Sequence, residues 1–156
     1  AKHIYIVGFR SSSFLAGYLN FYFRLIYDNV TQVQGGAAGT FDQLFRVGPG
    51  DVVIAICFPR YSELALKTVQ YAKDRGATII GVTDSEMSPV YQMSSGSLLV
   101  RNEMISFVDS LAAPMSMLNA LILASAQKQE TDISATFSEL EHVWDRFGIF
   151  GKVEDE

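Results

Sequence analysis

Short apolar runs alternate along the chain with longer stretches of helical periodicity. Runs of apolar and β-branched residues predict five strands, at 3–7, 30–34, 51–56, 77–82 and 97–100. After a glycine-rich loop at 35–39, helical spacing predicts the second of several helices, at 14–27, 41–46, 64–76, 88–93 and from 110 to 147. Strands that are apolar throughout are typical of a parallel sheet buried on both faces. The pattern therefore predicts an α/β fold, an open parallel sheet with helices on both faces.

In such a sheet the ligand crevice lies beyond the carboxyl ends of the strands, so the loops after the strands hold the candidate chemistry. The loop after the first strand carries Arg10, Ser11 and Ser12 and leads into a helix. Free amides at a helix start favour an anion, and hydroxyl groups add donors without charge. The alternative is that one serine caps the helix and the others fill the turn.

The loops after the third and fourth strands add further donors. Arg60 follows the third strand, beside the next helix, and suits bidentate contact with a phosphate or a carboxylate. Its alternative is a solvated surface arginine. Thr83 and Ser85 follow the fourth strand and add hydroxyl groups, whereas Asp84 there fits a cap or a turn. Three loops bearing hydroxyl groups at one sheet edge together indicate a binding site.

Composition narrows the classes of protein that fit this pattern. The 156 residues make about one domain, and 49% hydrophobic against 19% charged residues exclude a disordered chain. A net charge of −5 argues against direct contact with nucleic acid, and no apolar run is long enough to enter a membrane. The single cysteine, Cys57, excludes an internal disulfide and fits the reducing cytoplasm, where we expect the protein. The chain enters its first strand at once, with no leader, which suggests a segment of a longer protein.

Candidate catalytic groups are few. An aldose-ketose isomerase needs a positioned base, usually a glutamate or a histidine. His3 enters the first strand at the wrong edge of the sheet, His142 lies on a polar helix face, and Glu63 fits a dipole-compensating residue at a helix start. Cys57 has no histidine placed by sequence to activate it. Neither a metal-ligand spacing nor a nucleotide-binding glycine motif is present, so we expect no catalytic residue, no metal and no cofactor.

Five motifs then recur in the order of one known family, at 8–12, 51–62, 72–77, 83–89 and 106–110. On these motifs the chain resembles the sugar isomerase (SIS) domain, and most closely the ligand-binding domain of RpiR-type transcriptional regulators. The resemblance implies one SIS domain over 1–156, with a doubly wound, five-stranded parallel sheet of the flavodoxin-like type. It also implies a homodimer or higher homo-oligomer, a phosphosugar ligand at the serine-rich loops, and an upstream helix-turn-helix domain that contacts DNA and is absent from this chain.

The binding loops depart from the family pattern. Ser12 matches a serine of the family's first turn, but Arg10 stands where a glycine is common. In the loop after the third strand, Cys57 and Pro59 replace two serines and Arg60 replaces a glycine. Hydroxyl donors are lost and cations are gained. We therefore expect a site built around Arg60 with help from Arg10, with phosphate and carboxylate both open as the bound group.

The resulting hypothesis is a non-catalytic domain that senses a small anionic sugar derivative and acts through dimer geometry in a transcriptional regulator. The expected ligand-binding residues are Arg10, Ser11, Ser12, Arg60, Ser62, Thr83 and Ser85. The segment 30–46 and the helices over 110–147 are the expected dimerisation surfaces. Two alternatives stay open, a sugar-phosphate isomerase and a dimerisation domain with a vestigial ligand site.

Overall fold

A five-stranded parallel sheet forms the centre of the molecule. The computed structural model describes residues 1–105, 107–129 and 133–150. The strands are β1 (Ile4–Val7), β2 (Val30–Val33), β3 (Val52–Ile56), β4 (Thr78–Thr83) and β5 (Gly96–Leu99). They pair in the order β2-β1-β3-β4-β5, and every pair is parallel. The predicted α/β class and the five parallel strands are confirmed.

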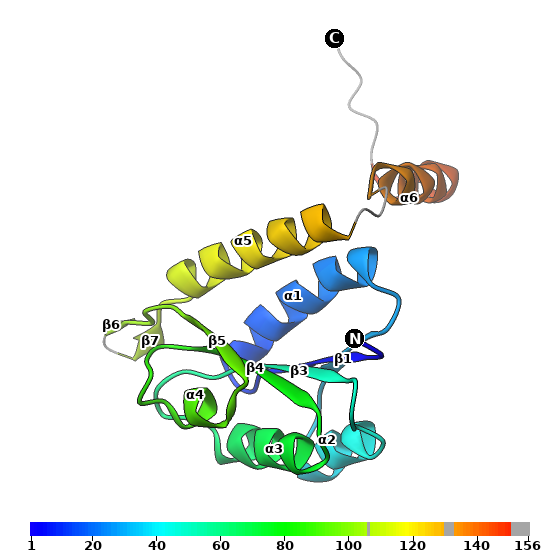
Figure 1. Cartoon of the computed structure of the whole chain (residues 1–156). Coiled ribbons are helices and arrows are strands. Elements are labelled where there is room, and N and C mark those ends of the chain that lie inside the picture. Colours follow the sequence, from blue (N-terminus) through cyan, green and yellow to red (C-terminus); the bar gives the residue numbers. More distant parts are fainter. Residues whose placement is uncertain (106, 130–132, 151–156) are drawn as a thin grey trace.

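Helices cover both faces of this sheet (Figure 1). The helices are α1 (Ser12–Ile26), α2 (Ala37–Leu44), α3 (Glu63–Asp74), α4 (Pro89–Met93), α5 (Ala112–Lys128) and α6 (Ile133–Phe147). Helices α1 and α5 lie on one face, α2, α3 and α4 lie on the other, and α6 lies beyond the layers and contacts α1. This arrangement is the doubly wound sheet that the sequence predicted.

Each face of the sheet has its own hydrophobic core. Ile6 and Ile54 point toward α1 and α5, while Val7 and Val53, the next or preceding residues, point toward α2 and α3. Side chains alternate between faces along a strand, so a strand covered on both sides must be apolar at every position. This requirement explains the continuous apolar runs from which the strands were predicted.

Two parts of the chain differ from the prediction. Helix α2 begins at Ala37, whereas the sequence predicted a loop through Gly39 and a helix from Phe41. The turn needs only Gly35, whose φ is +98°, and Gly36, which caps the helix in extended conformation. The small residues that follow are compatible with helix. The remaining predicted boundaries lie within two residues of those observed.

The second difference is a small antiparallel hairpin that no sequence pattern predicted. Its strands are β6 (Met104–Ile105) and β7 (Val108–Asp109), and α5 begins shortly after it. Two-residue strands are too short to show a period in the sequence. No helix in the described part of the chain is long and apolar enough to span a bilayer.

Candidate functional site

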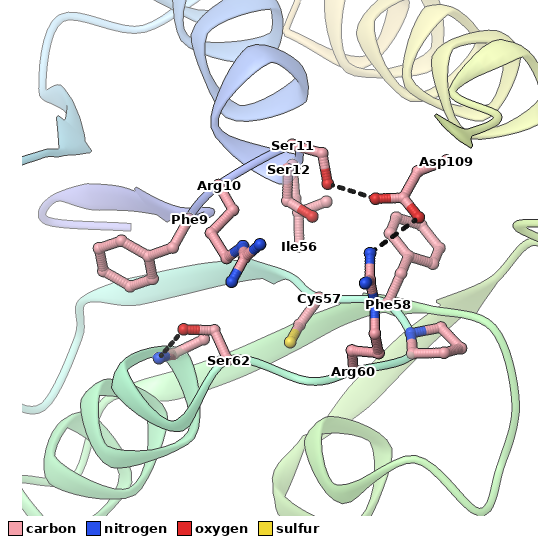
Figure 2. A pocket seen from close by; sticks show the side chains of 12 residues that line it. Phe9, Arg10, Ser11, Ser12, Ile56, Cys57, Phe58, Arg60, Ser62 and Asp109 are labelled. Atoms are coloured by element: carbon pink, nitrogen blue, oxygen red, sulfur yellow. Dashed lines mark hydrogen bonds and ion pairs between the residues drawn. The ribbon is translucent and has the colours of Figure 1, made fainter. Parts of the chain in front are cut away.

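A pocket of about 80 Å³ lies where the strand order reverses. Sheet neighbours β1 and β3 connect to the rest of the sheet in opposite directions, so the loops at their carboxyl ends diverge and leave a crevice. The loop after β1 and the loop after β3 form its walls, and Asp109 of β7 closes one side (Figure 2). The pocket therefore occupies the position at which doubly wound sheets bind their ligands.

Two arginines enter the pocket from opposite loops (Figure 2). Arg10 and Arg60 have φ angles of +56° and +63°, and no other non-glycine residue in the described ranges has a positive φ. The left-handed conformation costs an L-residue about 1–2 kcal/mol relative to the right-handed one. Residues held in it persist only where their surroundings fix the backbone, and such residues cluster at functional sites. Both loops thus keep a glycine-type turn while carrying a guanidinium group.

The turn that places Arg10 is held tightly between β1 and α1. A Cβ atom on Gly8 would lie 2.5 Å from the carbonyl oxygen of Ser12, so only glycine allows the strand end to approach the helix this closely. The hydroxyl of Ser13 donates to the carbonyl oxygen of Arg10 at 2.6 Å. These contacts fix the backbone of Arg10 at the pocket edge.

The expected serines of the first loop have separate roles. Ser12 is 7% exposed and lines the pocket. Ser11 makes no capping hydrogen bond to α1; its hydroxyl donates to Oδ2 of Asp109 at 2.8 Å instead. The other carboxylate oxygen of Asp109 lies 3.9 Å from Nη2 of Arg60. Asp109 therefore bridges the loops after β1 and β3.

The loop after β3 combines a helix cap with a buried thiol. The side chain of Ser62 accepts a hydrogen bond from the amide of Ala65 at 3.4 Å and caps α3, while also lining the pocket. Cys57 lines the same pocket and is buried. Burial, reinforced by the charge of Asp84, raises the pKa of the Cys57 thiol, although a hydrogen bond with the Ser62 backbone opposes the rise. The thiol is therefore neutral at pH 7.

The structure does not bring Thr83 and Ser85 to this pocket. Thr83 is fully buried and its hydroxyl is hydrogen-bonded to Ser88 at 2.7 Å. Neither Thr83 nor Ser85 is among the residues that line the pocket. The loop after β4 is instead joined to the loop after β3 by Tyr61, whose hydroxyl donates to Asp84 at 2.8 Å. Burial and this hydrogen bond raise the pKa of Tyr61 to about 12.

The candidate catalytic groups lie elsewhere. The imidazole of His3 is hydrogen-bonded to Thr31 at 2.9 Å, at the amino end of the sheet. His142 is exposed on α6, and Glu63 is exposed and paired with Lys67 at 3.3 Å. Within the described ranges, no cluster of histidine, cysteine and carboxylate side chains could hold a metal ion. Ser106, part of a motif noted in the sequence, lies outside the described residues.

Asp109 is the pocket residue that sequence reasoning missed. It is the single carboxylate among the described residues that line the pocket. Its position within the motif at 106–110 was a signal, but nothing local indicates contact with a loop 98 residues away. Together the side chains present two guanidinium groups, one carboxylate and several hydroxyl groups, a set that suits an anionic, hydroxylated ligand.

Comparisons with known proteins agree with this geometry. The sequence profile described as "SIS domain" matches residues 1–124. No curated protein matches the sequence. The structure is similar to the sugar isomerase domain of an RpiR transcription factor from Sphaerobacter thermophilus, with a TM-score of 0.84 and 21% identity over 91% of this chain and 79% of that one.

Two further solved structures hold ligands. The Vibrio vulnificus NanR protein, complexed with ManNAc-6P, is similar with a TM-score of 0.78 and 16% identity over 97% of this chain, which spans 58% of the NanR chain. An Escherichia coli CFT073 protein in complex with a sugar phosphate is similar with a TM-score of 0.69 and 21% identity, covering 85% of this chain and 75% of that one. At these identities the likeness shows a common fold.

Proposed function

The chain belongs to the SIS domain family, and from this we propose that it is the ligand-sensing domain of a transcriptional regulator, binding a small anionic sugar derivative of the phosphosugar type without chemical conversion. The ligand-binding residues in this proposal are Arg10, Ser11, Ser12, Arg60 and Ser62. The similar NanR structure holds ManNAc-6P, which supports a sugar phosphate as the ligand class.

One observation carries the proposal: Arg10 and Arg60, both in left-handed conformation, face a single pocket at the reversal of strand order. Guanidinium groups bind phosphate through paired, charge-assisted hydrogen bonds. Keeping arginine where glycine would relieve backbone strain indicates that the two cations serve a purpose at this pocket. A site vestigial in function would gain nothing from that strain.

The surroundings of the acidic groups favour sensing over isomerisation. A general base must be within reach of the proton that it removes and must be unprotonated and available. Asp109 is engaged by Ser11 and by Arg60, and Glu63 points to Lys67 outside the pocket. A sugar-phosphate isomerase is therefore the second candidate, and turnover is the observation that would establish it.

The output requires a second copy of the chain. Large apolar side chains are exposed mainly along one side of the molecule, on α1, α5 and α6: Phe14, Phe21, Leu123, Phe137, Val143 and Phe147. We place the dimer interface there, in a cytoplasmic homodimer whose DNA contacts belong to another domain, consistent with the net charge of −5. A ligand changes output only by binding two dimer arrangements with different affinity.

Calorimetric titration with a panel of sugar phosphates and sugar acids tests the proposal. We expect at least one sugar phosphate to bind the wild-type protein, and Arg60→Ala to abolish that binding while the protein stays folded. Arg46→Ala, which removes an exposed arginine outside the pocket, is the matched control and should leave affinity unchanged. No binding by the wild-type protein, or catalytic turnover of the ligand, would contradict the proposal.

A further inference from the structure

The carboxylate of Asp109 already uses the donors that a bound anion would need. Its Oδ2 accepts the hydrogen bond of the Ser11 hydroxyl at 2.8 Å, and its Oδ1 faces Nη2 of Arg60 at 3.9 Å. The side chain is 24% exposed, so it lies largely within the pocket wall. Building on the proposed function, we propose that Asp109 is an internal competitor, which occupies part of the anion site in the unliganded protein and which the ligand must displace.

The size of the pocket supports displacement. With Asp109 in place the pocket encloses about 80 Å³. Sites for small-molecule ligands usually enclose roughly 300–1,000 Å³. A sugar phosphate therefore does not fit the pocket as it stands, and some side chain that closes it must move. Asp109 comes from a hairpin outside the central sheet and reaches both binding loops, so its withdrawal widens the pocket between them.

Charge gives a second reason for displacement. A phosphate held by Arg60 would lie close to the Asp109 carboxylate, and two anions at such separations repel one another. Both groups also accept hydrogen bonds from the same hydroxyl of Ser11, which has one proton to donate. The carboxylate and the phosphate are thus alternatives at this site.

Internal competition lowers the apparent affinity by a fixed factor. The apparent dissociation constant equals the intrinsic constant divided by the fraction of molecules whose site is open. The hydrogen bond from Ser11 to a charged acceptor is the stronger of the two contacts of Asp109, because an exposed ion pair adds little. A bond of this kind corresponds to roughly a tenfold preference for the closed state.

Displacement of Asp109 also links the pocket to the proposed interface. Asp109 ends β7, and α5 starts at Ala112, while Ser11 immediately precedes α1. The two helices are joined further along by the Tyr18 hydroxyl, which donates to Asn119 at 2.5 Å. The Ser11–Asp109 bond therefore ties together the starts of the two helices that carry the exposed apolar face. A ligand that breaks it changes the restraint on α5.

Titration of inorganic phosphate, followed by NMR chemical shifts, tests the competitor directly. Asp109→Asn removes the charge and Asp109→Ala removes the group, so one variant remains informative if the other folds poorly. We expect both to bind phosphate about tenfold more tightly than the wild-type protein. Glu63→Gln removes a charge near the same loop from a side chain outside the pocket, and it should change affinity less than about twofold. Unchanged or weaker binding by the Asp109 variants, or an equal gain in Glu63→Gln, would overturn the inference.

Hydrogen exchange at Ser110 provides the second readout. Its amide donates to the Glu103 carbonyl at 3.1 Å, next to Asp109. Phosphate should speed this exchange in the wild-type protein, toward the rate in Asp109→Ala; slower exchange would mean that Asp109 closes onto the ligand and would overturn the inference. Phosphate binding that depends on Arg60 but not on Asp109 defeats the inference alone. Absence of phosphate binding in all variants defeats both it and the proposed function.

Discussion

The hydroxyl of Ser11 donates a 2.8 Å hydrogen bond to the carboxylate of Asp109, although 98 residues separate the two in the sequence. This bond joins the start of α1 to the end of β7 and closes one side of the pocket. Its partner contact, between Asp109 and Arg60, reaches the loop after β3. Three distant segments therefore meet at the point where the strand order reverses.

The strained backbone of Arg60 predicts an unusual order of stability. At a φ of +63°, glycine avoids a cost of about 1–2 kcal/mol but loses about 0.5–1 kcal/mol through the greater freedom of the unfolded chain. We expect Arg60→Gly to be more stable than Arg60→Ala by about 0.5–1 kcal/mol, which raises Tm by about 2 °C. Thermal unfolding followed by circular dichroism measures the difference. Both variants should fail to bind the ligand.

The matched comparison uses Arg24, an exposed arginine inside α1. There the backbone is helical, and glycine is less favourable than alanine by about 1 kcal/mol. Arg24→Gly should therefore be less stable than Arg24→Ala, the reverse of the order at Arg60. The same order at both positions would show that the left-handed turn at Arg60 stores no strain.

Tyr61 predicts a loss of stability at alkaline pH. Its pKa is raised from 10.0 to about 12 by burial and by the hydrogen bond to Asp84. Between these values the folded protein keeps a proton that the unfolded chain has lost, so the contribution is complete below pH 10 and falls as the pH rises toward 12. Urea unfolding at about pH 9 and about pH 11 should show a larger loss for the wild-type protein than for Tyr61→Phe. Equal losses would count against the Tyr61–Asp84 bond.

Cys57 reports on occupancy of the pocket. The thiol is buried, and burial raises its pKa, so little reactive thiolate forms at about pH 8. We expect Ellman's reagent to react slowly with the native protein, more slowly still with a bound sugar phosphate, and rapidly in urea. The sequence has one cysteine, so the signal is unambiguous. A reaction rate that the ligand leaves unchanged would place the ligand elsewhere.

The exposed apolar side chains predict which face forms the dimer. Leu123 on α5 is 63% exposed and Phe45, after α2 on the opposite face, is 68% exposed. We expect Leu123→Glu to convert the dimer to a monomer in analytical ultracentrifugation, because a buried, unpaired carboxylate is costly at an interface. Phe45→Glu is the control for the other surface suggested by the sequence and should remain dimeric. The opposite pattern would move the interface to the segment 30–46.

The central sheet could be predicted from sequence because burial on both faces makes each strand apolar throughout. Helix α2 was predicted late because glycine and alanine at 35–39 resemble a loop, although Gly35 alone carries the turn's positive φ. The β6–β7 hairpin was missed because its two-residue strands show no periodicity. Local patterns thus predict the elements that bury the most surface.

The site was predictable to the extent that the fold places its loops. Loops after β1 and β3 meet at the reversal of strand order, which brings Arg10, Ser12, Arg60 and Ser62 together. The loop after β4 lies on the other side of β3, and Thr83 is turned into the interior to bond Ser88. Asp109 depends on tertiary contact alone, so no spacing in the sequence predicts it.

A crystal structure of the protein with the sugar phosphate that calorimetry identifies tests the central claim most directly. We predict phosphate oxygens at about 2.7–2.9 Å from guanidinium nitrogens of both Arg10 and Arg60, the distance of charge-assisted hydrogen bonds. The Asp109 carboxylate should then be turned away from Ser11. A phosphate bound at another loop, for example beside Ser85, with Arg10 and Arg60 in contact only with solvent, would contradict the account.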